Sequence, residues 1–144
     1  MPRMSREIYT EEMRQTDLVF VYGTLQNLEW GPHPYLSYSE FIGDDVTRRK
    51  FVLGRVGFPY AFPREVVPRR FKKVLLPVEG QVFRMYDEEV FANLDGMEGY
   101  PRHYDRMIIH TKGGHKCWMY VQMDWDRSRY CSLCTVTEEG NWKW

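Results

Sequence analysis

One apolar run near the start of the chain limits most strongly how it can fold. Residues 18–22 read LVFVY without a charged side chain, and the run ends sharply at Gly23. A strand with one solvated face alternates apolar and polar residues, so an unbroken run of this length is typical of a strand buried on both faces. The sequence therefore predicts a covered strand that passes into a turn at residues 23–25.

A helix beginning after Asp87 is the second clear element. Asp is a favourable N-cap, and the two acidic residues that follow it suit the positive end of the helix dipole. Gly99 and Pro101 then stop the helix. Apolar residues recur at helical spacing in between and predict one buried face, formed by Val90, Phe91, Leu94 and Met97.

The remaining chain predicts more strands than helices. Alternating or β-branched segments indicate strands at residues 50–55, 78–85, 104–110 and 117–123, with a turn at 111–114 between the last two. We expect a short helix at 34–41. This order predicts a small α+β domain whose sheet is closed or strongly curved, with a helix packed against it.

The chain has 144 residues, which is enough for one domain. We divide it into a polar lead-in at 1–16, a domain at 17–124 and a tail at 125–144 that packs on or beside the domain. A basic stretch at 63–73 is expected to be a surface loop or an insertion. Its charge is more typical of a solvated face than of a site for an acidic partner, and it comes from Arg64, Arg69, Arg70, Lys72 and Lys73.

Charge and composition argue against several classes of partner. Twenty basic and twenty acidic side chains cancel, so affinity for nucleic acid through phosphate neutralisation is not expected. No run of about 18 apolar residues could span a membrane. The first residues lack the apolar centre of a secretory signal, and three cysteines are too few for a disulfide scaffold. These features predict a protein of the reducing cytoplasm.

Two carboxylates near the end of the predicted helix are candidates for chemistry. Acidic groups at a helix C-terminus oppose the helix dipole, and residues that break a local rule are often functional. Asp95 follows Leu94 and is expected to face outward, whereas Glu98 follows Met97 and could point to the margin of the core. A desolvated Glu98 would have a raised pKa and could move protons near neutral pH. The alternative is a solvated glutamate before a glycine C-cap.

The turn at Gly23 offers a second candidate site. Glycine lets the chain turn abruptly, so the next backbone N–H groups can converge on one carboxylate or phosphate. Gly23 could equally do no more than turn the chain.

A zinc site is the third candidate, and the weakest. Cys131 and Cys134 form a lone C-x-x-C that His115 and Cys117 would have to complete. A structural zinc site normally has two tight ligand pairs on turns, so the H-x-C pair at the start of a predicted strand suits this poorly. We therefore predict no metal.

Several strings together resemble the γ-glutamylcyclotransferase-like family, which includes the AIG2-like proteins and γ-glutamylamine cyclotransferase. VFVYGTL at 19–25 resembles its opening strand and loop, and VGFPY at 56–60 resembles its Gly/Pro-bearing segment. GQVF at 80–83, LDGMEG at 94–99 and YDR at 104–106 resemble its second signature. The similarity covers roughly 18–123, so the lead-in, the basic stretch and the tail are expected to exceed the family core.

The resemblance implies a small mixed β-barrel with one main helix packed against it and a cavity at its mouth. It assigns the role of general acid/base to Glu98 and no proton transfer to Asp95. It implies no cofactor. The residues that it places against the substrate, with backbone N–H groups of the 22–25 loop on the glutamyl α-carboxylate, are Tyr22, Gly23, Thr24, Leu25, Pro59, Tyr60 and Tyr104.

The activity that the resemblance implies is cleavage of a γ-glutamyl amide to 5-oxoproline and a free amine or amino acid. The partner would be this small molecule, not a nucleic acid or a membrane, and the protein would be a monomer or a homodimer. The alternative is a catalytically inactive binding module that holds a small anionic ligand or a partner in the same cavity.

Overall fold

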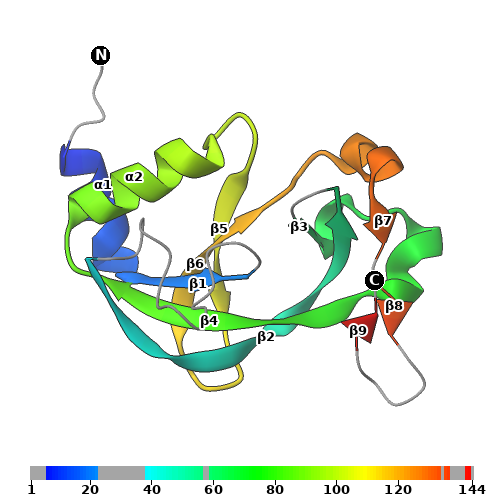
Figure 1. Cartoon of the computed structure of the whole chain (residues 1–144), viewed down its shortest axis with the longest axis horizontal. Helices are drawn as coiled ribbons and strands as arrows, with labels where there is room; N and C mark the ends of the chain where they lie inside the picture. Colours follow the sequence, from blue (N-terminus) through cyan, green and yellow to red (C-terminus); the bar gives the residue numbers. More distant parts are fainter. Residues whose placement is uncertain (1–5, 23–37, 57–58, 134, 137–141, 144) are drawn as a thin grey trace.

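Seven strands of the computed structural model form one curled mixed sheet, and six of them follow one another in the order β3-β2-β4-β1-β6-β5 (Figure 1). The structure describes residues 6–22, 38–56, 59–133, 135–136 and 142–143. The strand bounds are β1 Leu18–Val21, β2 Ser39–Arg55, β3 Pro59–Pro63, β4 Leu76–Met85, β5 Asp105–His110 and β6 Lys116–Val121, and β7 Ser132–Leu133 pairs with β2.

The covered strand is confirmed as β1. It lies between β4, to which it is antiparallel, and β6, to which it is parallel. Val19 and Val21 join the apolar cluster on one face of the sheet, whereas Leu18 and Phe20 join the cluster on the other face. All four residues are buried, because the sheet carries a core on each side of its central strand.

The curl of the sheet comes from β2, a strand of 17 residues. Its pairing with β4 shifts register between Phe41 and Gly43 and again between Val46 and Lys50, and such irregularities bend a strand. Beyond β6, the Gln122 N–H donates to the carbonyl of Ala61 in β3 at 3.0 Å. The predicted α+β class and strongly curved sheet are therefore confirmed, as a half-barrel.

Strand β2 is longer than sequence patterns predicted. The strand predicted at 50–55 is only its last part, and the short helix predicted at 34–41 is wrong where it can be compared, since residues 39–41 pair with β4 as a strand. Residues 34–37 lie outside the described part of the chain. The strand extends because β4 supplies a long partner for it, which no local pattern reports.

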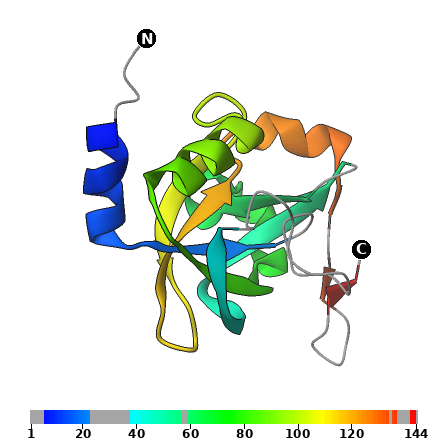
Figure 2. The ribbon, with the colours of Figure 1, turned by 60° about the vertical axis from the view of Figure 1, so that its left-hand side comes forward.

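The predicted helix is confirmed as α2, Glu88–Glu98. The Asp87 side chain accepts a hydrogen bond from the Val90 N–H at 3.1 Å, as expected of an N-cap. A second helix, α1 Arg6–Gln15, crosses beside α2, with the Tyr9 ring 5.4 Å from that of Phe91 (Figure 2). The lead-in is thus packed on the domain at this point.

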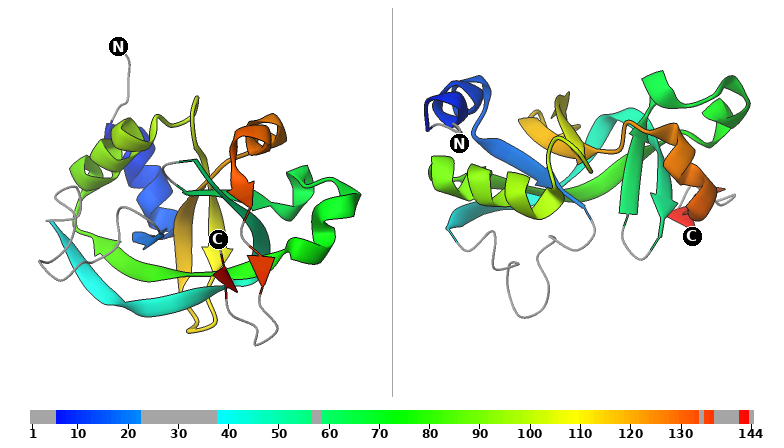
Figure 3. Two further views of the ribbon diagram at one scale, coloured as in Figure 1. Left: turned by 45° about the vertical axis from the view of Figure 1, so that its right-hand side comes forward. Right: turned by 90° about the horizontal axis from the view of Figure 1, so that it is seen from above.

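The basic stretch and the tail form short elements at the other end of the sheet from α1 and α2 (Figures 1 and 3). The stretch folds into two 3-10 helices, η3 Arg64–Val66 and η4 Arg69–Val74, where a loop was expected. The tail contains the 3-10 helix η5 Trp125–Tyr130 and a hairpin of β8 Thr135–Val136 and β9 Trp142–Lys143. None of the described helices has the length and apolar character that crossing a membrane requires.

Candidate active site

Glu98 is the last residue of α2. The helix ends there because Gly99 takes a left-handed conformation, with φ of 68°, and returns its N–H to carbonyls of the last turn. The Glu98 side chain lies at the margin of the core, and burial raises the pKa of its carboxyl from about 4.5 to about 7. Near neutral pH such a group can accept a proton and release it again.

Tyr22 and Tyr104 lie close enough to Glu98 for its charge to act on them. Burial is the main cause that raises the pKa of Tyr22 well above its usual value, followed by the neighbouring Tyr104 and Glu98. Burial and then Glu98 raise the pKa of Tyr104 in the same way. Both phenols are therefore neutral hydrogen-bonding groups at physiological pH.

Hydrogen bonds to the backbone fix both phenols. The Tyr22 hydroxyl donates to the carbonyl of Tyr120 at 2.7 Å and accepts from the N–H of Ala61 at 3.2 Å. The Tyr104 hydroxyl donates to the carbonyl of Pro59 at 2.7 Å. The end of β1 is thereby linked to β3 and β6, so the site rests on the sheet.

Tyr60 is the third tyrosine at this site, and it contacts both Tyr104 and His103. The rings of Tyr60 and Tyr104 meet edge to face at 5.5 Å, and the Tyr60 hydroxyl lies 3.2 Å from Nε2 of His103. The Arg127 guanidinium lies 3.0 Å from Nδ1 of His103. A guanidinium can only donate, so Nδ1 accepts and Nε2–H donates to Tyr60. Burial and the charge of Arg127 lower the pKa of His103, which favours this neutral tautomer.

The structure thus brings together five of the residues that sequence analysis singled out: Tyr22, Pro59, Tyr60, Glu98 and Tyr104. Gly23, Thr24 and Leu25 lie outside the described residues, so the position of their N–H groups relative to Glu98 stays a prediction. The functional role of each of these eight residues also stays a prediction at this point.

Sequence analysis missed His103 and Tyr120. Tyr120 lies two positions after Trp118 in β6, and strand alternation indicates that both face the same side. A tyrosine on a buried face needs a hydrogen-bond partner for its hydroxyl, so the sequence contained a signal that could have identified Tyr120. His103 follows the end of α2 in a loop whose sequence contains no comparable signal, because its partners come from β3 and η5.

The prediction that Asp95 faces outward is wrong. Asp95 is 4% exposed. It accepts hydrogen bonds from Nε and Nη2 of Arg106 at 2.9 and 3.1 Å, from the Tyr9 hydroxyl at 2.9 Å and from the Tyr120 hydroxyl at 2.5 Å. The apolar residues of α2 predicted only one buried face. Asp95 lies on another side of the helix, and α1 and the β5–β6 hairpin cover that side as well.

Arg106 is enclosed by aromatic rings as well as by its carboxylate. Its guanidinium carbon lies 4.4 Å from the ring centroid of Phe91, 4.2 Å from that of Tyr100 and 4.7 Å from that of Trp118. Because Tyr120 binds Asp95 through its hydroxyl and Tyr22 through its carbonyl, this buried ion pair supports the candidate site from below.

The cysteines give no support to a zinc site in the described part of the chain. Cys117 is buried in β6 and Cys131 follows η5, both as free thiols. His115 instead contacts Asp45, with Nδ1 2.9 Å from Oδ2. No group of three or more potential metal ligands gathers among the described residues, and Cys134 lies outside them.

The raised pKa of Glu98 predicts how stability depends on pH. The folded protein keeps a proton that an unfolded glutamate loses above about pH 4.5, so this group reduces the free energy of unfolding as the pH rises towards 7. Glu98→Gln removes the effect. We expect the variant to gain on the order of 1–3 kcal/mol relative to the native protein between pH 4.5 and pH 8.

Urea unfolding at these two pH values measures the difference. Glu89→Gln is the matched control, because Glu89 is exposed in the first turn of the same helix. A gain for Glu98→Gln that does not change with pH, or that equals the change for Glu89→Gln, would contradict burial of the Glu98 carboxyl.

The family model and the similar proteins that match this sequence carry closely similar descriptions. The family model described as "Gamma-glutamyl cyclotransferase, AIG2-like" matches residues 19–143, and so continues through the tail. Two proteins named "Putative gamma-glutamylcyclotransferase" are similar in sequence. The one from Methanocaldococcus jannaschii is 30% identical over 88% of this chain and 96% of its own length. The one from Vibrio cholerae is 33% identical over 87% of this chain and 94% of its own length.

Solved structures share the fold. An AIG2-like protein from Mus musculus superposes with a TM-score of 0.61 at 22% identity, covering 86% of this chain and 90% of that protein. A protein from Pyrococcus horikoshii described as uncharacterized superposes with a TM-score of 0.55 at 23% identity, covering 76% of this chain and 80% of that one.

Proposed function

This chain belongs to the gamma-glutamyl cyclotransferase, AIG2-like family, and we propose that it cleaves a γ-glutamyl amide into 5-oxoproline and a free amine or amino acid. The names of its relatives support a cyclotransferase-type enzyme in general terms. The reaction, the substrate and the residues that carry it are our proposal. We further expect a monomer or homodimer in the cytoplasm.

The observation that carries the proposal is the carboxyl of Glu98, whose pKa lies near 7 beside two neutral phenols. An ordinary solvated glutamate is ionised at neutral pH and holds a proton too weakly to return it to an amine. Glu98 can do both steps, because its protonated and ionised forms are both populated there.

The substrate supplies its own nucleophile. Glu98 accepts a proton from the α-ammonium group, and the resulting amine attacks the γ-carbonyl carbon to form the five-membered ring. The bond from that carbon to the departing nitrogen then breaks, and Glu98 returns the proton to that nitrogen. The ring nitrogen then gives up its second proton, and the released amine takes up a proton from solvent to leave as an ammonium, so protons and charge balance without a water molecule as nucleophile.

Folding the substrate back on itself is the main task that remains for the protein. A well-oriented intramolecular attack can have an effective molarity of about 10⁵–10⁸ M, so a site that holds the folded-back conformer can supply much of the rate. Tyr22, Tyr60 and Tyr104 provide rigid walls, because two of them are fixed to the backbone and Tyr60 is fixed by His103. We assign the α-carboxylate to the N–H groups of residues 23–25.

Incubation with a panel of γ-glutamyl amino acids and γ-glutamylamines tests the proposal. We expect 5-oxoproline and the free amine in equal amounts from at least one member, and neither product from the matched α-glutamyl isomers. Saturable binding of γ-glutamyl compounds without product would instead favour the binding-module alternative. Release of glutamate in place of 5-oxoproline would show hydrolysis and would contradict the cyclisation.

A further inference from the structure

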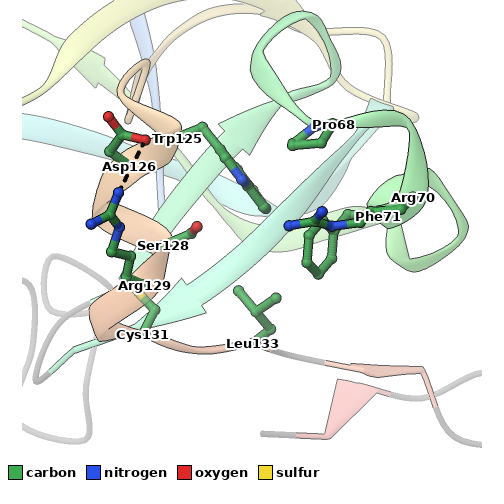
Figure 4. Close-up of a pocket in the computed structure, with 9 residues that line it drawn as sticks. All are labelled: Pro68, Arg70, Phe71, Trp125, Asp126, Ser128, Arg129, Cys131 and Leu133. Atoms are coloured by element: carbon green, nitrogen blue, oxygen red, sulfur yellow. Dashed lines mark ion pairs between the residues drawn. The ribbon is translucent and has the colours of Figure 1, made fainter.

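A cavity of about 430 Å³ lies between η4 and η5, where the basic stretch faces the start of the tail (Figure 4). Both segments were singled out by sequence analysis, and the proposed reaction uses none of the residues that line this cavity. Cavities of 300–1,000 Å³ are the usual size for sites that bind small organic molecules. The residues that line the cavity indicate which kind of molecule could bind there.

The apolar part of the wall is aromatic. The Trp125 ring projects into the space between the two 3-10 helices and lies 5.2 Å from the ring of Phe71. Behind it, Trp125 meets the fully buried ring of Phe62 edge to face at 4.9 Å. The indole is therefore supported by the core while it contributes to the cavity, so it offers a fixed surface to a planar group.

The polar part of the wall is mainly basic. Arg70 lies with its guanidinium carbon 5.0 Å from the ring centroid of Phe71 and forms no ion pair with any described residue. Arg129 comes from η5 on the other side, but its guanidinium turns away from Arg70 towards Asp126, its only described acidic partner, at 3.8 Å (Figure 4). Two guanidinium groups against one carboxylate leave the lining with a net positive charge.

We infer that this cavity is a binding site for a small organic anion with a planar apolar body. The body would lie against Trp125 and Phe71, and the anionic group would bind Arg70, whose guanidinium can hold a carboxylate through two parallel N–H groups. Arg129 would add positive charge at longer range. The inference does not depend on the proposed enzymatic activity.

Three naphthalene compounds that share the same ring system and carry substituents of different charge provide the test: 2-naphthoate, 2-naphthylmethanol and 2-naphthylmethylammonium. Calorimetric titration of the full chain should give saturable binding of 2-naphthoate, several-fold tighter than binding of the alcohol, with a larger difference between 2-naphthoate and the cation. The estimate assumes that each partly exposed charge pair contributes up to about fivefold.

Variants show whether the anion binds at this cavity. Arg70→Gln/Arg129→Gln should remove the preference for the anion and leave the weak affinity for the alcohol. Lys112→Gln/Lys116→Gln is the matched control, since it removes two exposed positive charges from the β5–β6 hairpin instead. It should retain the preference.

Glu98→Gln separates this site from the proposed active site and should bind 2-naphthoate normally. Equal affinity for the three compounds would overturn the inference. So would a preference that survives the double arginine substitution, or one that disappears with Glu98→Gln. None of these results depends on whether 5-oxoproline is formed.

Discussion

Glu98→Gln is expected to lower the rate of 5-oxoproline release by about 10³-fold, within the range typical for loss of a general acid/base. Glutamine has nearly the same shape as glutamate but cannot accept the proton of the α-ammonium group or return one to the departing nitrogen. The loss should appear in kcat, with little change in KM, because the substrate's α-carboxylate and backbone are held by other groups.

The native enzyme and Glu98→Gln should also differ in how their rates depend on pH. Since the pKa of Glu98 is about 7 in the protein without substrate, kcat/KM should change through an inflection near that value, and the residual kcat/KM of Glu98→Gln should lack it. Glu89→Gln again serves as control and should keep full activity. Native-like activity in Glu98→Gln, with its fold verified by circular dichroism, would remove Glu98 from the mechanism.

The elements that sequence patterns predicted correctly are those determined by their own residues. The run at 18–22 has no polar residue to place in solvent, so β1 had to be covered on both faces. The bounds of α2 follow from Asp87 and Gly99, which cap it through local hydrogen bonds. Neither prediction needed knowledge of the rest of the chain.

The errors arose where a distant segment decides the outcome. Most of β2 is strand because β4 pairs with it, although sequence patterns had predicted a strand only at 50–55 and a short helix at 34–41. Asp95 is buried because Tyr9 reaches it from α1, 86 residues away. Glu98 could be proposed from sequence, since a carboxylate at a helix C-terminus breaks a local rule, but its phenol neighbours come from different parts of the chain.

Asp95→Asn is expected to lower the free energy of unfolding by about 3 kcal/mol, because it leaves the buried Arg106 guanidinium with Glu12, at 3.2 Å, as its one remaining carboxylate among the described residues. The side chains of Arg106 and Asp95 are 3% and 5% exposed, so water cannot replace the lost carboxylate. Thermal unfolding should shift down by about 10 °C or more. Asp44→Asn is the control: this aspartate is exposed and its one described partner is Gln81. It should change stability by less than about 0.5 kcal/mol.

A double variant tests whether the loss of stability comes from a buried charge left without its partner, or from any change of side chain at positions 95 and 106. Arg106→Met alone leaves Asp95 charged and buried, so it should cost about as much as Asp95→Asn. Asp95→Leu/Arg106→Met removes both charges and should cost clearly less than the sum of the two single changes, although the hydroxyls of Tyr9 and Tyr120 then lose their acceptor. Additive costs would show that the two side chains stabilise the fold independently. A coupling of several kcal/mol would show that they act as one unit holding α1, α2 and the floor of the proposed active site together.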